Sequence, residues 1–244
     1  MNAARGIAVQ VQGAVTQFST NFQTAINPQI TKSYAVGDYA YMHSLIFHSS
    51  KFTFLLLATI SFPVLLETEM ILQLWLETVP NYTAVFVRLM LCTTIIDAMA
   101  GAFMVSAQAT GAVRVYQSVV GGILLTIVPV SYIVLKMGAE PWSVFIVHLC
   151  VCILAFAVRL FILCRMIHLS LSGYFTKVLL RCMGVLIIAL PLPLILLYFL
   201  SDTFINSIMV CLSGLLAMLF SSYVIGLVSV SYTHLRAHET EADL

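Results

Sequence analysis

The stretch that decides the fold runs from Ser143 to Ile167 and reads SVFIVHLCVCILAFAVRLFILCRMI. Its only charged side chains are Arg159 and Arg165, and most of the other residues are apolar. An α-helix needs about 20 largely apolar residues to cross the hydrocarbon core of a bilayer. The stretch therefore predicts a membrane-spanning helix, and long apolar runs of this kind recur along the chain.

The composition of the whole chain agrees with a membrane environment. Of the 244 residues, 61% are hydrophobic and 9% are charged, and the mean hydropathy is +1.04. Soluble domains have about 45–50% apolar and about 25% charged residues, so a water-soluble fold is excluded. The formal net charge is +1, and the lysines and arginines stand singly, which argues against nucleic acid as a partner. We expect the partners to be membrane lipids and molecules that lie among them.

Counting the apolar runs predicts an all-α, polytopic membrane bundle over residues 1–230. The runs are too long and too evenly apolar for barrel strands, and helices satisfy their backbone groups internally. Seven spans are predicted: Ile7–Ile26, Phe52–Trp75, Val85–Ala107, Val115–Leu135, Ser143–Ile167, Val178–Leu200 and Ile205–Val230. Residues 231–244 read SYTHLRAHETEADL and share no pattern with the preceding chain. We expect this tail to be either non-native or an ordinary disordered terminus.

Lysine and arginine are distributed unequally between the two sets of loops, and cytoplasmic loops are the ones enriched in them. The basic residues in or beside the loops after spans one, three and five are Lys32, Lys51, Arg114, Arg159, Arg165, Lys177 and Arg181. The opposite loops are mainly acidic, with Glu67, Glu69, Glu77, Glu140 and Asp202. The chain is thus expected to start outside the cell. That start is unusual for a protein with no leader, and a missing upstream portion would explain it.

The first span differs from the others because its polar residues lie on one face. At 100° per residue this face combines amides and hydroxyls with one arginine; it comprises Asn2, Arg5, Gln12, Thr16, Ser19, Thr20, Gln23 and Asn27. Polar residues inside a membrane usually face a cavity or the bundle interior, so the helix is expected to line water. The residues expected to line a substrate cavity are Arg5, Gln12, Thr16, Ser19 and Gln23. An interfacial amphipathic helix and polar contacts between neighbouring helices are the alternatives.

Asp97 is the one carboxylate near the centre of a predicted span. An acidic residue at that depth is a functional candidate by default, here for coupling to an ion or a proton. Thr93, Thr94 and Gly101 lie near it in helical projection, whereas Arg88 projects from the opposite face and cannot pair with it within one helix. A protonated or hydrogen-bonded packing residue is the alternative interpretation.

Signals for a metal, a cofactor or an enzyme are weak in this chain. The six cysteines lie in or at the ends of apolar runs without CxxC pairs, so we interpret them as small buried hydrophobic residues. His148 and Cys152 lie one helical turn apart, but no further ligand accompanies them. The sequence has no nucleophile elbow, zinc-protease motif, P-loop or dinucleotide fingerprint. We therefore expect no metal, no cofactor and no enzymatic activity.

Four short stretches together resemble Wzx-type flippases. They are NAARGIA from Asn2, NPQITKSYAVGD from Asn27, ILQLWLETVP from Ile71 and QATGAVRVYQ from Gln108. Their order and spacing are similar to the C-terminal half of these members of the MATE-like multidrug/oligosaccharidyl-lipid/polysaccharide superfamily, in versions typical of Bacteroides-type bacteria. The resemblance extends from Asn2 to about Val230. It implies seven helices in total, of which the last two are peripheral and the others form the C-terminal lobe. The N-terminal lobe of the same protein would be the missing partner.

The resemblance also implies an activity. Such proteins move an undecaprenyl-pyrophosphate-linked oligosaccharide across the bacterial cytoplasmic membrane by alternating access, for polysaccharide or O-antigen biosynthesis. Cationic residues in the family's cavity receive the pyrophosphate, and Arg5 is the best-placed match here, with Arg88 as a second candidate. Asp97 would serve ion coupling. The alternatives are a drug/cation antiporter of the same superfamily, a membrane-embedded glycan polymerase or ligase, and a non-transporting scaffold.

Overall fold

The structure is a computed structural model, and it describes residues 1–201 and 203–227. Throughout these residues the regular structure is helical, with no strand. The elements are α1 (Asn2–Ala35), α2 (Tyr39–Leu66), α3 (Thr68–Trp75), α4 (Thr83–Met99), α5 (Gly101–Ala109), α6 (Val113–Leu125), α7 (Ile127–Lys136), α8 (Ser143–Ile167), α9 (Leu171–Tyr174), η1 (Phe175–Leu179), α10 (Leu180–Ala189), α11 (Pro191–Phe199), α12 (Phe204–Ser221) and η2 (Ser222–Leu227). The tail at 231–244 and Asp202 lie outside the described residues.

Within this part of the chain, six helical stretches are long and apolar enough to cross a membrane, where the sequence predicted seven. They are Tyr39–Leu66, Thr83–Ala109, Val113–Lys136, Ser143–Ile167, Leu171–Phe199 and Phe204–Ile225. The difference is α1, which is one continuous helix of 34 residues but is too polar to count as an apolar span. The chain is a multi-pass membrane protein. The surroundings of α1 must account for its many polar side chains.

The predicted second span, Phe52–Trp75, is wrong at both ends. The apolar helix α2 begins at Tyr39, where the Asp38 side chain accepts a hydrogen bond from the Tyr41 backbone N–H at 3.0 Å. It ends before Glu67, whose backbone is non-helical, and α3 is a separate short helix. The hydropathy pattern missed the first half of α2 because polar side chains such as Ser49 and Ser50 are buried there between helices.

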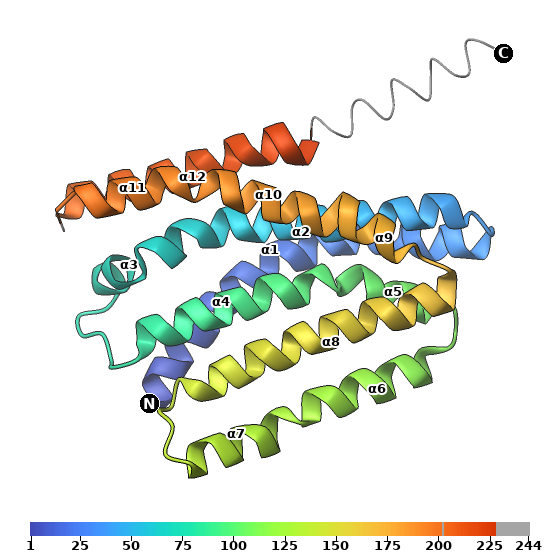
Figure 1. Ribbon diagram of the computed structural model, residues 1–244, viewed down its shortest axis with the longest axis horizontal. Coiled ribbons are helices and arrows are strands. Elements are labelled where there is room, and N and C mark those ends of the chain that lie inside the picture. The colour runs from blue at the N-terminus through green and yellow to red at the C-terminus, as the bar shows by residue number, and fades with distance from the viewer. Residues whose placement is uncertain (202, 228–244) are drawn as a thin grey trace.

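The helices form a core with two flanking groups (Figure 1). In the core, α1 packs against α2, α4 and α5, and α4 packs against α8. The α6–α7 stretch covers the outer side of α8, while α10, α11 and α12 lie on the side of α2. Helix α1, which is too polar to count as an apolar span, thus lies against three other helices and positions its polar residues next to α4 and α5.

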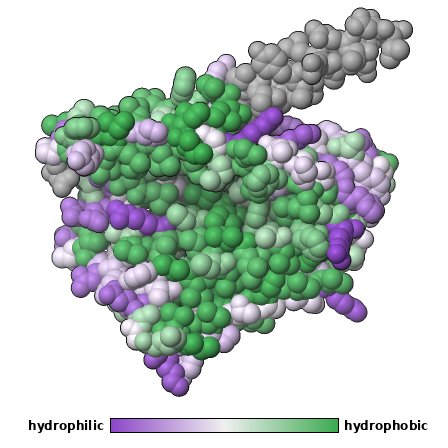
Figure 2. Space-filling model, in the orientation of Figure 1, coloured by the Kyte–Doolittle hydropathy of each residue, from purple (hydrophilic) through white to green (hydrophobic). Residues whose placement is uncertain are grey.

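Three of the basic residues that the sequence assigned to one set of loops lie at the same end of the bundle. The C-terminal end of α1, the start of α6 and the end of α8 lie together at one end of the bundle, and they carry Lys32, Arg114 and Arg165 (Figure 1). Figure 2 shows a broad hydrophobic surface across the middle of the visible face, with hydrophilic residues toward its margins. Lys51, however, is not a loop residue, since it is 3% exposed within α2.

Candidate functional site

A polar cavity of about 290 Å³ lies between α1, α4, α5 and α8. Five residues predicted on the polar face of α1 line it together: Gln12, Thr16, Ser19, Thr20 and Gln23. The facing wall consists of Thr93, Thr94, Asp97, Ala98 and Gly101 with His148 and Cys152 of α8. The structure thus brings the predicted α1 residues and the predicted carboxylate to one place, although they are far apart in the chain.

The cavity lies beside a break in a membrane span. The helix changes from α4 to α5 at Ala100, which frees backbone carbonyl groups inside the bundle. Gln23 Nε2 donates to the Ala98 carbonyl at 2.8 Å, and Ser50 Oγ donates to the Met99 carbonyl at 2.8 Å. Freed backbone groups at membrane depth need such partners. The break is therefore stabilised by side chains from α1 and α2.

Gly101 lies in close approach to the Gln23 side chain at this break. A Cβ atom at position 101 would overlap the carboxamide of Gln23. The absence of a side chain at Gly101 lets the Gln23 amide lie against the start of α5 and reach the Ala98 carbonyl. Gln23 therefore has a structural role in addition to the predicted cavity-lining role.

Asp97 is paired with a residue that the sequence assigned to a loop. Arg159 of α8 donates from Nη1 to Oδ1 of Asp97 at 2.6 Å. The Asp97 side chain is 54% exposed beside the cavity, whereas the Arg159 side chain is 14% exposed. Because Arg159 lies about two turns before the end of α8, its placement beside a loop was wrong. The ion pair joins α4 to α8 and balances the carboxylate.

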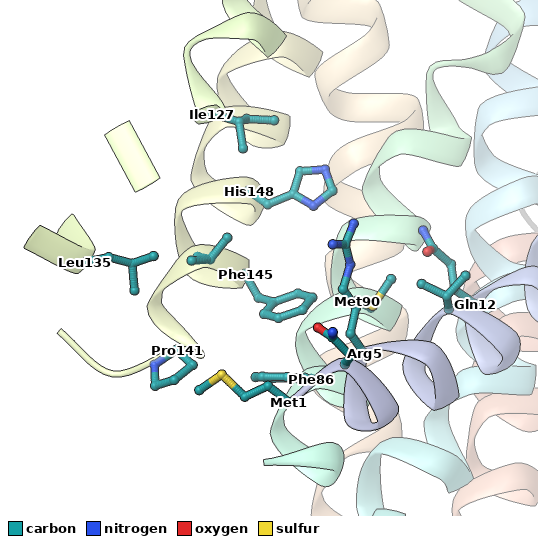
Figure 3. Close-up of a pocket in the computed structure, with 13 residues that line it drawn as sticks. Met1, Arg5, Gln12, Phe86, Met90, Ile127, Leu135, Pro141, Phe145 and His148 are labelled. Carbon is teal, nitrogen blue, oxygen red and sulfur yellow. The ribbon is translucent and has the colours of Figure 1, made fainter. Parts of the chain in front are cut away.

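A second, larger cleft of about 680 Å³ adjoins the polar cavity at the N-terminal end of α1. It shares two lining residues with the cavity, Gln12 and His148. Figure 3 shows Arg5 and Gln12 of α1 on one side of this cleft and His148 on the other. The remaining wall is mostly apolar, from Phe86, Met90, Ile127, Leu135, Val144 and Phe145.

The cleft is amphipathic in a specific way. Its polar side chains can all donate hydrogen bonds, and none is a carboxylate: they are the guanidinium of Arg5, the carboxamides of Asn2 and Gln12, which can also accept, and the imidazole of His148. Across the described chain, the Arg5 and His148 side chains take part in no hydrogen bond or ion pair. An arrangement of apolar wall and unpaired donors suits a hydrocarbon ligand with an anionic end.

Arg88, the other predicted cationic contact, lies away from both cavities. It donates from Nε to Thr68 Oγ1 at 3.0 Å, and its Nη2 is 3.8 Å from Oε1 of Glu69. These contacts join α4 to α3. Arg88 lines neither the polar cavity nor the amphipathic cleft, so the prediction that it lines the substrate cavity is not supported.

Two residues of the site were not recognised from the sequence as site residues. Arg159 and His148 are separated by about three helical turns and so lie on one face of α8. That spacing was the available signal, together with Asp97 as a carboxylate that needs a counterion in a membrane. As for metals, the described residues contain no group of three histidine, cysteine or acidic side chains that could hold an ion.

Helix α1 has a further polar face, which neither lines the polar cavity nor packs against another helix of the described chain. Gln10, Gln17, Asn21 and Thr24 are exposed, and Gln17 Nε2 donates to Asn21 Oδ1 at 3.0 Å. The apolar residue Phe22, in contrast, packs against Phe52 of α2 with ring centroids 6.1 Å apart.

Comparison of the chain with protein-family models, with curated proteins and with solved structures found no match.

Proposed function

We propose that this chain is the C-terminal lobe of a flippase for lipid-linked oligosaccharides in a bacterial cytoplasmic membrane. The observation that carries the proposal is the amphipathic cleft, in which Arg5 faces an apolar wall that includes Phe86 and Phe145. An undecaprenyl-pyrophosphate-linked glycan combines the same chemistries, a hydrocarbon chain and a pyrophosphate. The short-motif resemblance to Wzx-type flippases supports the same substrate class.

The polar cavity supports a transport role over a scaffold role. A transporter that carries a glycan needs a path of hydrogen-bonding groups through the hydrocarbon layer, and Gln12 lies where cleft and cavity meet. The uncovered face with Gln10, Gln17 and Asn21 fits this role too. Exposed amides are costly in hydrocarbon, so this face borders either water or another protein segment. The N-terminal lobe implied by the resemblance is the segment that we propose for it.

The charges favour an anionic substrate over the cationic drug of the alternative antiporter. The cavity's carboxylate, Asp97, is already balanced by Arg159 at 2.6 Å. Arg5 leaves the cleft with a net positive charge. A cationic ligand would be repelled by Arg5, whereas a pyrophosphate gains a charge-assisted hydrogen bond.

We propose that Asp97 serves ion coupling through its ion pair. Protonation of the Asp97 carboxylate, or its binding of a cation, would remove the charge that holds Arg159. Arg159 would then be free to change its contact between α8 and α4. This step would link a proton or cation gradient to the relative position of two helices that border the cavity.

Binding to the purified chain in phosphatidylcholine nanodiscs tests the function. The probes are a short polyprenyl-pyrophosphate disaccharide and the matching polyprenol without phosphate. We expect the phosphorylated probe to bind and Arg5→Gln to weaken its binding about tenfold, the value for one charge-assisted hydrogen bond. The matched control is Arg114→Gln, which removes an exposed arginine at the opposite end of the bundle. Equal affinity for both probes, or no effect of Arg5→Gln, would contradict the proposal.

A further inference from the structure

His148 occupies a position that the proposed function has not yet used. It projects from α8 and lines both the amphipathic cleft and the polar cavity. Its ring is half-buried and makes no hydrogen bond to any residue of the described chain. A half-buried imidazole without a protein partner, at the junction of two cavities, has both ring nitrogens available to a ligand.

Arg5 enters the same cleft from the opposite side. The two side chains come from α1 and α8, and Figure 3 shows both reaching toward the interior of the cleft. A pyrophosphate has oxygen atoms on two phosphorus centres, so it can accept hydrogen bonds from both walls at once. A guanidinium on one wall and an imidazolium on the other would hold it between α1 and α8.

The charged and titratable groups around His148 are few. Arg5 and Met1 line the cleft with it, while Asp97 of α4 and Cys152 of α8 line the cavity with it. The carboxylate of Asp97 is engaged by Arg159. An anion that enters from the cleft side therefore meets cations or neutral donors first.

From this arrangement we infer that His148 is the second contact for the pyrophosphate group and makes its binding depend on pH. The inference rests on the proposed function and deepens it by naming a second headgroup contact. Histidine is the side chain that commonly changes charge between pH 5 and 8. His148 accordingly strengthens binding in its protonated form and loses most of this effect when neutral. Binding and release of the headgroup then follow the proton activity on the side to which the cleft is open.

The test compares wild type, His148→Gln and His168→Asn in phosphatidylcholine nanodiscs at pH 6 and pH 8. His168 is the matched control because it is exposed at the C-terminal end of α8, in a left-handed conformation that asparagine tolerates. The probe is a short polyprenyl pyrophosphate. We expect His148→Gln to bind about tenfold more weakly than wild type at pH 6 and within about twofold at pH 8. His168→Asn should match wild type at both values.

Comparing variants at one pH removes the titration of the probe, which affects all three proteins equally. Inorganic pyrophosphate and phosphatidylglycerol serve as further probes, and weaker binding of both would assign the site to an isoprenoid pyrophosphate. The inference would be overturned if His148→Gln had no effect at pH 6, or the same effect at pH 6 and pH 8. In that case binding of the probe by wild type would leave the proposed function standing. If wild type bound the probe at neither pH 6 nor pH 8, both the inference and the proposed function would be overturned.

Discussion

Nη1 of Arg159 lies 2.6 Å from Oδ1 of Asp97, so an ion pair joins two membrane helices beside a polar cavity. The two partners differ in exposure, with 14% for the arginine side chain and 54% for the carboxylate. Removing either partner therefore has unequal consequences. A largely buried guanidinium without its counterion costs more than a carboxylate that still contacts a cavity.

We predict that Asp97→Asn destabilises the chain by about 2–3 kcal/mol and Arg159→Gln by about 1–2 kcal/mol. The double variant should lose less than the sum, because neither charge is then left alone. Unfolding in mixed detergent micelles, followed by tryptophan fluorescence, measures these differences. Strictly additive losses would show that the ion pair makes no net contribution.

A second prediction concerns the helix break at Ala100. Gly101→Ala places a methyl group where the Gln23 carboxamide lies and breaks its hydrogen bond to the Ala98 carbonyl. We expect a loss of about 1 kcal/mol, as for one hydrogen bond. The control is Gly122→Ala in α6, where a Cβ atom meets nothing within 4 Å.

The same glycine substitution in a Gln23→Ala background separates this explanation from a general effect on the helix. With the carboxamide already absent, Gly101→Ala should cost nothing further. If it costs as much as in the wild-type background, the close approach of Gln23 is not the reason for the glycine.

A third prediction concerns water in the polar cavity. In a variant whose native cysteines are all replaced, Thr16→Cys should react with a membrane-impermeant thiol reagent, since Thr16 lines the cavity. Leu216→Cys on α12 is the matched control, because Leu216 is 63% exposed in the structure and lies on an apolar helix that we expect to face lipid. We expect labelling at position 16 and not at 216.

Mass spectrometry of the labelled protein in nanodiscs measures both sites. Labelling at neither position, with full reaction after denaturation, would mean that the cavity is dry. Labelling at both would mean that exposure to the reagent does not distinguish the cavity from the lipid-facing surface.

The sequence predicted α8 with its observed bounds, Ser143–Ile167, because a long apolar run ends there in turn-forming residues at both ends. It also placed Thr16 and Gln23 on one face of α1, and both line the polar cavity, since helical periodicity is a local property. The start of α2 was missed because Lys51 reads as a loop residue in a hydropathy count, although neighbouring helices bury it.

Contacts between residues of different helices could not be predicted from the single sequence. Arg159 and Asp97 are separated by 62 residues, and nothing in either helix states which helix lies next to it. The same holds for His148, which becomes a candidate only when α1 is seen across the cleft. Periodicity gives the face of each helix, whereas packing determines which faces meet.

Photocrosslinking tests the central claim most directly, namely that the amphipathic cleft receives an isoprenoid pyrophosphate. The probe is a polyprenyl pyrophosphate with a diazirine on its first isoprene unit, added to the chain in phosphatidylcholine nanodiscs. We predict crosslinks at Phe86, Met90 and Phe145. An excess of the same polyprenyl pyrophosphate without the diazirine should remove these crosslinks by competition, and Arg5→Gln should weaken them. Crosslinks spread over the exposed apolar residues of α11 and α12, unchanged by competitor, would contradict the claim.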